Sequence, residues 1–154
     1  MTITIATVIS AVKRHLSVIG KRLYNKEGKN MFSDITLSSA EDTNILTQYI
    51  NASAQDIEAA LKQFITASTY SAASIAMTIA NTRGDDDFET RTKDLAESYI
   101  TLNTVGSYLS MLHPDLAQKY IADAQNRMEA LMMYVVYKKQ PAAPNYSYAD
   151  VTGY

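Results

Sequence analysis

The stretch VGSYLSMLHPDLAQKY, residues 105–120, decides the fold, because one apolar helical stripe ends and another begins at its proline. Pro114 cannot continue the preceding helix, but it suits the first position of the next one. Two helices joined by almost no loop usually form an antiparallel hairpin. The sequence therefore predicts helices over about 88–112 and 114–138, with His113 as a cap or packed residue at the corner.

Both helices of the predicted hairpin carry apolar residues at spacings of three and four, the period of a helix with one buried side. Gly106 lies inside the first stripe at some cost in helix propensity. We expect a close contact between the two helices at this small residue. The stripes consist of Leu95, Tyr99, Leu102, Val105, Leu109 and Leu112, and of Leu116, Tyr120, Ala124, Met128, Leu131 and Val135.

Two more helices are predicted upstream of the hairpin. An apolar stripe over residues 4–24 indicates an amphipathic helix, with His15 on its polar side. A loop follows over 25–37. A second helix is predicted over 39–65, because Ser38 with Glu41 and Ser39 with Asp42 both have the spacing of a capping box.

The segment between these helices and the hairpin has a different pattern. Ile75, Met77 and Ile79 alternate with small residues, which favours a short strand or irregular extended segment near 70–82, although a helix of small residues also fits. Residues 83–87, RGDDD, indicate a turn. Their acids lack the alternating spacing of a calcium loop, so we expect them to cap the next helix.

Together these elements predict a mainly α protein: a bundle of about four helices, with a short extended or β segment and an extended C-terminal arm. A length of 154 residues and a hydrophobic fraction of 47% suit one domain with a real core. We place this domain at 1–140 and the arm at 141–154. No apolar run is long enough to span a membrane, and the N-terminal charges stand in the wrong order for a signal peptide.

The sequence lacks the usual marks of catalysis. Without cysteine, thiolate metal ligands, disulfides and a cysteine nucleophile are excluded. The two histidines are far apart, and no phosphate-binding glycine motif or Gly-x-Ser-x-Gly elbow is present. We therefore expect no enzymatic activity, no catalytic residues, no cofactor and no metal site.

Charge is distributed unevenly along the chain. Residues 1–30 hold six Lys and Arg against one Glu, whereas residues 31–60 hold five acids and no Lys or Arg. These blocks are two ordinary solvated helix faces, or they pair within the chain or between neighbouring copies. Four basic residues that could instead follow DNA phosphates are Lys13, Arg14, Lys21 and Arg22.

The C-terminal part carries the candidate interface residues. The last two turns of the fourth helix are apolar on every side, so they contact either the rest of the fold or another subunit. We expect a subunit contact through Met133, Tyr134 and Tyr137. Prolines then end the helix, and the arm alternates large and small residues, as an added β-strand does. Its tyrosines, which would dock on a neighbour unless the end is simply frayed, are Tyr146, Tyr148 and Tyr154.

The hairpin also carries a family resemblance. Residues 114–120, PDLAQKY, and 136–141, VYKKQP, together with the order of elements, resemble the small helical head–tail connector (adaptor) proteins of tailed bacteriophages, especially those of phages and prophages of Bacteroides-like hosts. The likeness lies mostly in residues 88–141. This chain departs from the family in lacking a Trp in the third helix, where Tyr108 would substitute, and in its Tyr-rich tail.

The resemblance implies a structural virion protein at the head–tail interface, assembled in the host cytoplasm. Such proteins form a ring, commonly of twelve copies, which binds the portal protein and further ring or tail proteins around a DNA channel and contacts no membrane. Two alternatives from other classes stay open. One is a small helical interaction or regulatory module, and the other is a DNA-binding protein that uses the basic helix.

Overall fold

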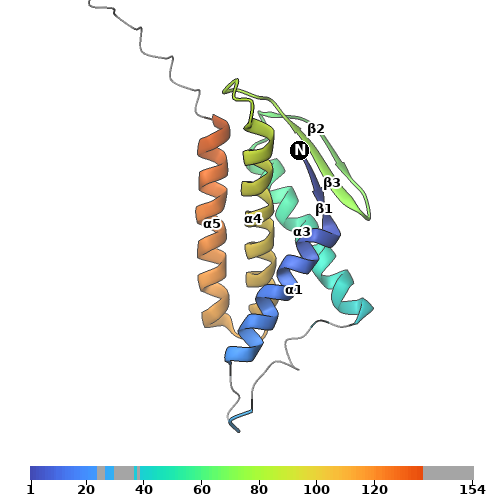
Figure 1. Cartoon of the computed structure of the whole chain (residues 1–154), viewed down its shortest axis with the longest axis vertical. Coiled ribbons are helices and arrows are strands. Elements are labelled where there is room, and N and C mark those ends of the chain that lie inside the picture. Colours follow the sequence, from blue (N-terminus) through green and yellow to red (C-terminus); the bar gives the residue numbers. More distant parts are fainter. Residues whose placement is uncertain (24–26, 30–36, 38, 137–154) are drawn as a thin grey trace, which may run out of the picture.

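The structure, a computed structural model, describes residues 1–23, 27–29, 37 and 39–136. The described part is mainly helical, which confirms the predicted fold class, and a small sheet lies against one side of the helices (Figure 1). The elements in chain order are β1 (Thr2–Thr4), α1 (Ile5–Arg22), α3 (Ala40–Ala60), β2 (Ile65–Tyr70), β3 (Ser74–Ile79), α4 (Phe88–Leu109) and α5 (Pro114–Val136).

Helices α4 and α5 form the predicted antiparallel hairpin (Figure 1). The close contact expected at Gly106 is confirmed. A Cβ atom placed there would lie 2.7 Å from Cγ1 of Ile121 and 3.2 Å from its backbone nitrogen. Only a residue without a side chain allows the two backbones to approach this closely.

The corner between α4 and α5 is slightly longer than predicted. Helix α4 ends at Leu109 rather than at residue 112, and a turn leads to Pro114. The carbonyl of His113 accepts the N–H groups of Leu116 and Ala117 at 3.1 and 2.9 Å. His113 therefore precedes α5 with its carbonyl accepting the first hydrogen bonds of the helix, and it is half-buried at the corner where the sequence placed it.

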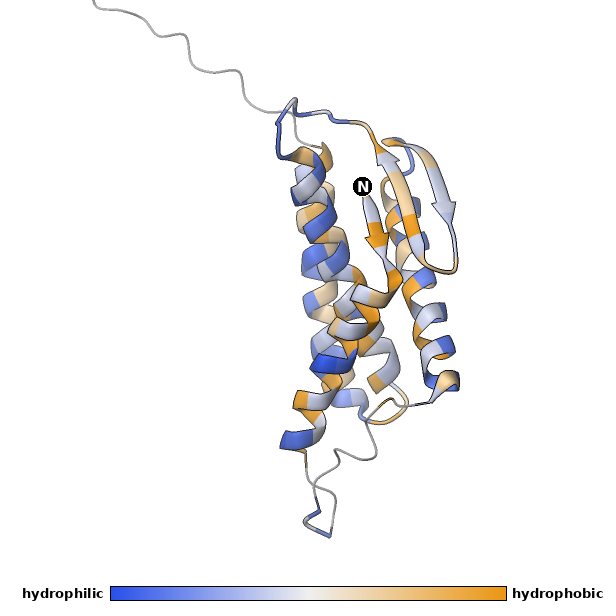
Figure 2. Ribbon diagram, turned by 45° about the vertical axis from the view of Figure 1, so that its right-hand side comes forward, coloured by the Kyte–Doolittle hydropathy of each residue, from blue (hydrophilic) through white to orange (hydrophobic). Residues whose placement is uncertain are grey.

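Helix α1 buries its predicted stripe against α3 and α4. Val8, Val12 and Leu16 are almost completely buried. In Figure 2 hydrophobic and hydrophilic positions alternate along the ribbon of this helix. Helix α3 begins with one of the two predicted capping boxes. The Oγ of Ser39 accepts the N–H of Asp42, whose carboxylate accepts the N–H of Ser39. The other box involves residue 38, which lies outside the described residues.

The predicted end of the second helix at residue 65 is wrong. Helix α3 ends at Ala60, and a turn over 61–64 leads directly into β2, so that Ile65 is the first residue of a strand. Leu61, Phe64 and Ile65 continue the helical spacing of apolar residues, so the sequence pattern gives no sign that the helix ends before them. Leu61 is completely buried, so packing and not periodicity sets this boundary.

The sheet is larger than the single extended segment that the sequence predicted. Strands β2 and β3 form an antiparallel hairpin, and β1 pairs with the other edge of β3, in the order β1-β3-β2. Strand β1 was not predicted, because three residues that run straight into α1 carry no strand pattern of their own. The predicted boundary between the domain and its arm lies outside the described residues.

Candidate interaction surfaces

The outer face of the sheet consists of small, uncharged residues. Ile3, Ile75 and Met77 point inward and are buried. Directly paired residues of antiparallel strands point to the same side, so their neighbours form the opposite face. The register assigns this outer face to Thr2, Thr4, Ala67, Thr69, Ser74, Ala76 and Thr78.

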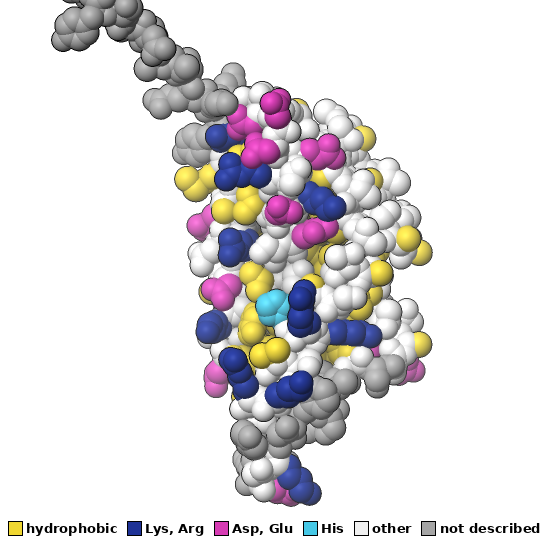
Figure 3. Space-filling view, viewed as in Figure 1, with side chains coloured by type: hydrophobic (Ala, Val, Ile, Leu, Met, Phe, Trp, Pro, Cys, Tyr) yellow, Lys and Arg dark blue, Asp and Glu magenta, His cyan; other side chains and the backbone are white. Residues whose placement is uncertain are grey.

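Charge is absent from the sequence that builds most of this face. No charged residue stands between Lys62 and Arg83. In Figure 3 the upper right-hand margin, where β2 and β3 lie, is correspondingly white and yellow. The cores of protein interfaces are depleted of charge in the same way.

The outer edge of β2 has unpaired backbone groups. Apart from the N–H of Ile65, which donates to Leu61, no backbone hydrogen bond of β2 is formed outside its ladder with β3 in the described part of the chain. Proteins usually protect such edges with charged residues, proline or bulges. β2 has only an irregularity between Ile65 and Ala67, which leaves Ala67–Tyr70 regular and open.

The inner side of β2 is fastened to α3 through Glu58. Its carboxylate accepts hydrogen bonds from Ser68 Oγ at 2.6 Å and from the Tyr70 hydroxyl at 2.8 Å. These two bonds lower the pKa of Glu58. Burial, together with the neighbouring carboxylate, raises the pKa of Tyr70. The sheet is thus held on one side while its outer face and edge stay open.

A second apolar patch lies at the end of α5, where the sequence predicted a subunit contact. The exposed fractions of Met132, Met133 and Val136 are 38%, 57% and 45%. Helix α5 packs mainly on α4, so this patch and the sheet lie on opposite sides of the molecule (Figure 1). Tyr137 and the three arm tyrosines lie outside the described residues.

Tyr134 is not part of that exposed patch. Its ring stacks on Phe88 with centroids 5.7 Å apart, and the guanidinium groups of Arg83 and Arg91 lie 4.7 and 5.3 Å from its centroid. The interaction is therefore within the chain. The sequence left a contact with the rest of the fold open, but the pattern of α5 gives no sign that the 83–87 turn provides it.

The acids of the turn before α4 form ion pairs with arginines. Arg83 Nε lies 2.8 Å from Asp85 Oδ2, and Arg91 Nε lies 3.7 Å from Asp87 Oδ2. Asp87 is the N-cap residue of α4, but its side chain makes no capping hydrogen bond. The hydroxyl of Thr82 also donates to the carbonyl of Val135, which ties this turn to the end of α5.

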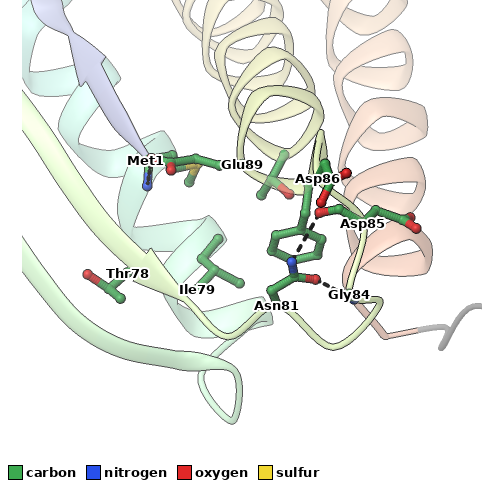
Figure 4. A pocket seen from close by; sticks show the side chains of 10 residues that line it. Met1, Thr78, Ile79, Asn81, Gly84, Asp85, Asp86 and Glu89 are labelled. Atoms are coloured by element: carbon green, nitrogen blue, oxygen red, sulfur yellow. Dashed lines mark hydrogen bonds and ion pairs between the residues drawn. The ribbon is translucent and has the colours of Figure 1, made fainter.

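A cavity of about 530 Å³ lies between this turn and the sheet (Figure 4). Its lining includes Asp85, Asp86 and Glu89. The amino group of Met1 forms an ion pair with Glu89 at 3.0 Å and donates a hydrogen bond to the carbonyl of Met77 at 2.8 Å. Within the described ranges, no group of three or more His, Asp and Glu side chains is arranged to hold a metal ion.

The predicted basic residues lie along α1. Arg14, Lys21 and Arg22 are exposed and Lys13 is half-buried. Lys and Arg side chains gather on the lower half of the face in Figure 3, over α1 and the first half of α5. Beside them, a groove of about 440 Å³ is lined by residues of α1, α4 and α5, among them His15, Asp94, Glu97 and Arg127.

The sequence predicted that His15 lies on the polar side of its helix, but the residue is half-buried. Its ring contacts Tyr120 of α5 edge to face, with centroids 6.2 Å apart.

Two acids of the acidic block, residues 31–60, form hydrogen bonds within the chain. Glu58 accepts hydrogen bonds from β2, and Asp56 accepts one from the Tyr99 hydroxyl at 3.0 Å. The rest of the predicted pairing between the charge blocks stays a prediction.

Comparison with protein families, curated proteins and solved structures finds no match to this chain. In the described residues, no helix is both long and apolar enough to cross a membrane. The function must therefore be argued from the surfaces themselves and from the resemblance of residues 88–141.

Proposed function

We propose that this chain is a structural subunit of a homo-oligomeric ring, and specifically a head–tail connector that joins the portal of a tailed bacteriophage to its tail. In this function it carries out no chemistry. It assembles in the host cytoplasm and becomes part of the virion. The resemblance of residues 88–141 supports this assignment and a ring of twelve copies.

The observation that carries the proposal is the pair of different surfaces on opposite sides of the molecule. One is the uncharged sheet, and the other is the exposed patch of Met132, Met133 and Val136 on α5. A ring needs a heterologous interface, in which one surface of each copy binds a different surface of the next. Two unlike surfaces that face away from each other meet that requirement, whereas a two-fold dimer needs only one.

The basic residues of α1 have a place in the same assembly. Arg14, Lys21 and Arg22 are exposed and belong to neither of the two proposed ring surfaces. In a ring they would face the DNA channel or the acids of a neighbouring protein. Contacts with DNA phosphates there would be independent of base sequence.

The deciding experiment is native mass spectrometry with negative-stain imaging, on the chain alone and mixed with the portal protein encoded nearest to its gene. We expect a ring seated on the portal. A small, defined oligomer that ignores the portal would overturn the proposal in favour of a helical regulatory module. No association of any kind would equally overturn it.

The DNA contact is tested separately. We expect weak binding of the assembled ring to duplex DNA that falls as salt rises, because contacts with phosphates release counterions. Replacing Lys13, Arg14, Lys21 and Arg22 by Gln should flatten this salt dependence, as measured by fluorescence anisotropy. A control replaces two lysines outside α1, Lys62 and Lys93, by Gln, and is compared with Lys21 and Arg22 replaced alone, so that both sets remove two charges. Equal effects of the two sets would contradict a role specific to α1.

A further inference from the structure

We infer that the cavity between β3 and the turn before α4 binds a primary ammonium group on a short aliphatic chain. Such a group belongs to a free alkylamine or to the lysine side chain of another protein. The inference goes beyond the proposed function and does not rest on it, because the residues of this cavity all belong to one copy of the chain. Its volume of about 530 Å³ lies in the usual range of small-molecule sites.

The first argument is the charge of the cavity wall. Three carboxylates line the cavity, and two of them have a cationic partner. Asp85 pairs with Arg83 at 2.8 Å, and Glu89 pairs with the amino group of Met1 at 3.0 Å. Asp86 forms no ion pair with the described part of the chain. One negative charge is therefore left over, and one further cation balances it.

The second argument is a buried hydroxyl without a partner. Thr92 lines the cavity and is 1% exposed, yet its Oγ1 has no hydrogen-bond partner among the described residues. A helical threonine can donate its hydroxyl to the carbonyl four residues earlier, as Thr43 and Thr47 do in α3. A buried polar group without a partner costs free energy. An ammonium group has three donors and no acceptor, so it suits the lone pairs of this oxygen.

The third argument is the arrangement of polar and apolar side chains around the cavity. Glu89 and Thr92 stand three residues apart on α4, so they are neighbours on one side of the helix. An ammonium group between them reaches both the carboxylate and the hydroxyl. Asp86 and Glu89 lie on one side of the cavity in Figure 4, and Ile79 of β3 lies on the other. Ile79 and the buried Phe88 provide the apolar surface along which an aliphatic chain packs.

A bare metal ion fits this cavity less well. As described above, the carboxylates in the described ranges are not arranged as a metal-binding group. The apolar side chains of the lining also have no use in binding a metal ion, whereas they contact the carbon chain of an alkylammonium. The chemistry of the lining therefore favours an organic cation.

The experiment is ligand-observed NMR on the full-length chain, by saturation transfer to n-butylamine at neutral pH, where the amine is protonated. Saturation transfer detects weak binding to a single chain and to a large ring alike. We expect a saturable signal from the butyl group. We expect none from n-butanol, which has the same carbon chain without the charge.

Two variants locate the site. Thr92→Val replaces the hydroxyl by a methyl group of the same shape, and it should weaken the binding of n-butylamine roughly tenfold, because a hydrogen bond from a charged donor is lost. Asp86→Asn should weaken binding several-fold and leave the fold unchanged, because this side chain is exposed. Thr104→Val is the matched control and should bind like the unchanged chain. Thr104 is also buried in α4 with an unpartnered hydroxyl, but it does not line this cavity.

Three results would overturn the inference: no saturable transfer to n-butylamine, equal transfer to n-butanol, or equal losses of binding in Thr92→Val and Thr104→Val. A lysine blocked at both ends, Nα-acetyl-lysine N-methylamide, then identifies the source of the ammonium group. If it binds at least as tightly as n-butylamine, the cavity takes a lysine side chain of another protein. If only n-butylamine binds, the cavity takes a free amine. Both of these results support the ammonium site.

Discussion

The α4–α5 hairpin buries its smallest residue against a neighbouring helix, whereas the sheet turns its small residues toward solvent. Gly106 is buried and lets Ile121 approach within the space of a missing Cβ. Ala67 and Thr69 also have small side chains, yet they are exposed on a face without charge. A small residue in the first setting serves the fold of one chain. In the second setting we expect that it can be changed at little cost in stability, because its side chain is exposed.

The largest effect on stability is expected inside the hairpin. Leu131 is completely buried, so Leu131→Ala should lower the free energy of unfolding by about 2–5 kcal/mol, from lost burial and the cavity left behind. Urea denaturation measures it. Met132→Ala, one residue along and 38% exposed, is the matched control and should cost less than about 1 kcal/mol. Similar losses at the two positions would contradict the described packing of α5.

Gly106→Ala should have the next largest effect. Overpacking typically costs about 1–3 kcal/mol, and the better helix propensity of Ala returns about 1 kcal/mol. The added Cβ meets a backbone nitrogen as well as a flexible side chain, so we expect a net loss of up to about 2 kcal/mol. Ser107→Ala is the control, with a change within about 0.5 kcal/mol. A more stable Gly106→Ala protein would show that the helices are further apart.

A substitution on the sheet face should leave stability nearly unchanged and affect assembly instead. Thr69→Lys places a charge on an exposed position, so we expect the free energy of unfolding to change by less than about 0.5 kcal/mol. Assembly should nevertheless fall, because a lysine protects an edge strand from added strands. Ring yield on the portal measures this, with Ser110→Lys as control. A destabilised chain, or a normal ring yield, would remove the contrast between the two regions.

The smallest effect is expected from pH, and only in the sheet. Hydrogen bonds from Ser68 and Tyr70 lower the pKa of Glu58 below its ordinary value near 4.5. The ionised carboxylate therefore stabilises the fold fully above that value, and this contribution is lost as the pH falls through the lower pKa of the folded state. Protection against hydrogen exchange, measured relative to the intrinsic exchange rate at each pH, should fall in β2 before it falls in α4 as the pH is lowered. Glu58→Gln should remove this response, and a Gln variant with an unchanged pH profile would rule Glu58 out.

The helices were predictable because burial imposes a period on them. The stripe of α1, the Pro114 corner and the close contact at Gly106 are all local patterns that the structure confirms. The end of α3 was not predictable, because Leu61 and Ile65 continue the helical spacing although the helix ends at Ala60. A strand as short as β1 has no period of its own, and only its pairing with β3 defines it.

The candidate surfaces were predictable only in part. Met133 was expected at an interface and is exposed, but its neighbour Tyr134 packs inside the chain, on Phe88. The sequence shows that α5 ends in apolar residues, yet it does not show which of them the 83–87 turn covers. The open edge of β2 was also beyond the sequence, because an edge exists only once the order of strands is known.

The pairing of β1 with β3 also delays completion of the sheet during synthesis. Thr2 pairs with Ala76, so β1 cannot pair until more than seventy further residues have been translated. At ordinary rates of translation this delay is roughly 4–14 s. In refolding from denaturant the order is different, because the local α4–α5 hairpin closes sooner than so distant a pairing. The nascent chain, by contrast, has all three strands before α5 exists.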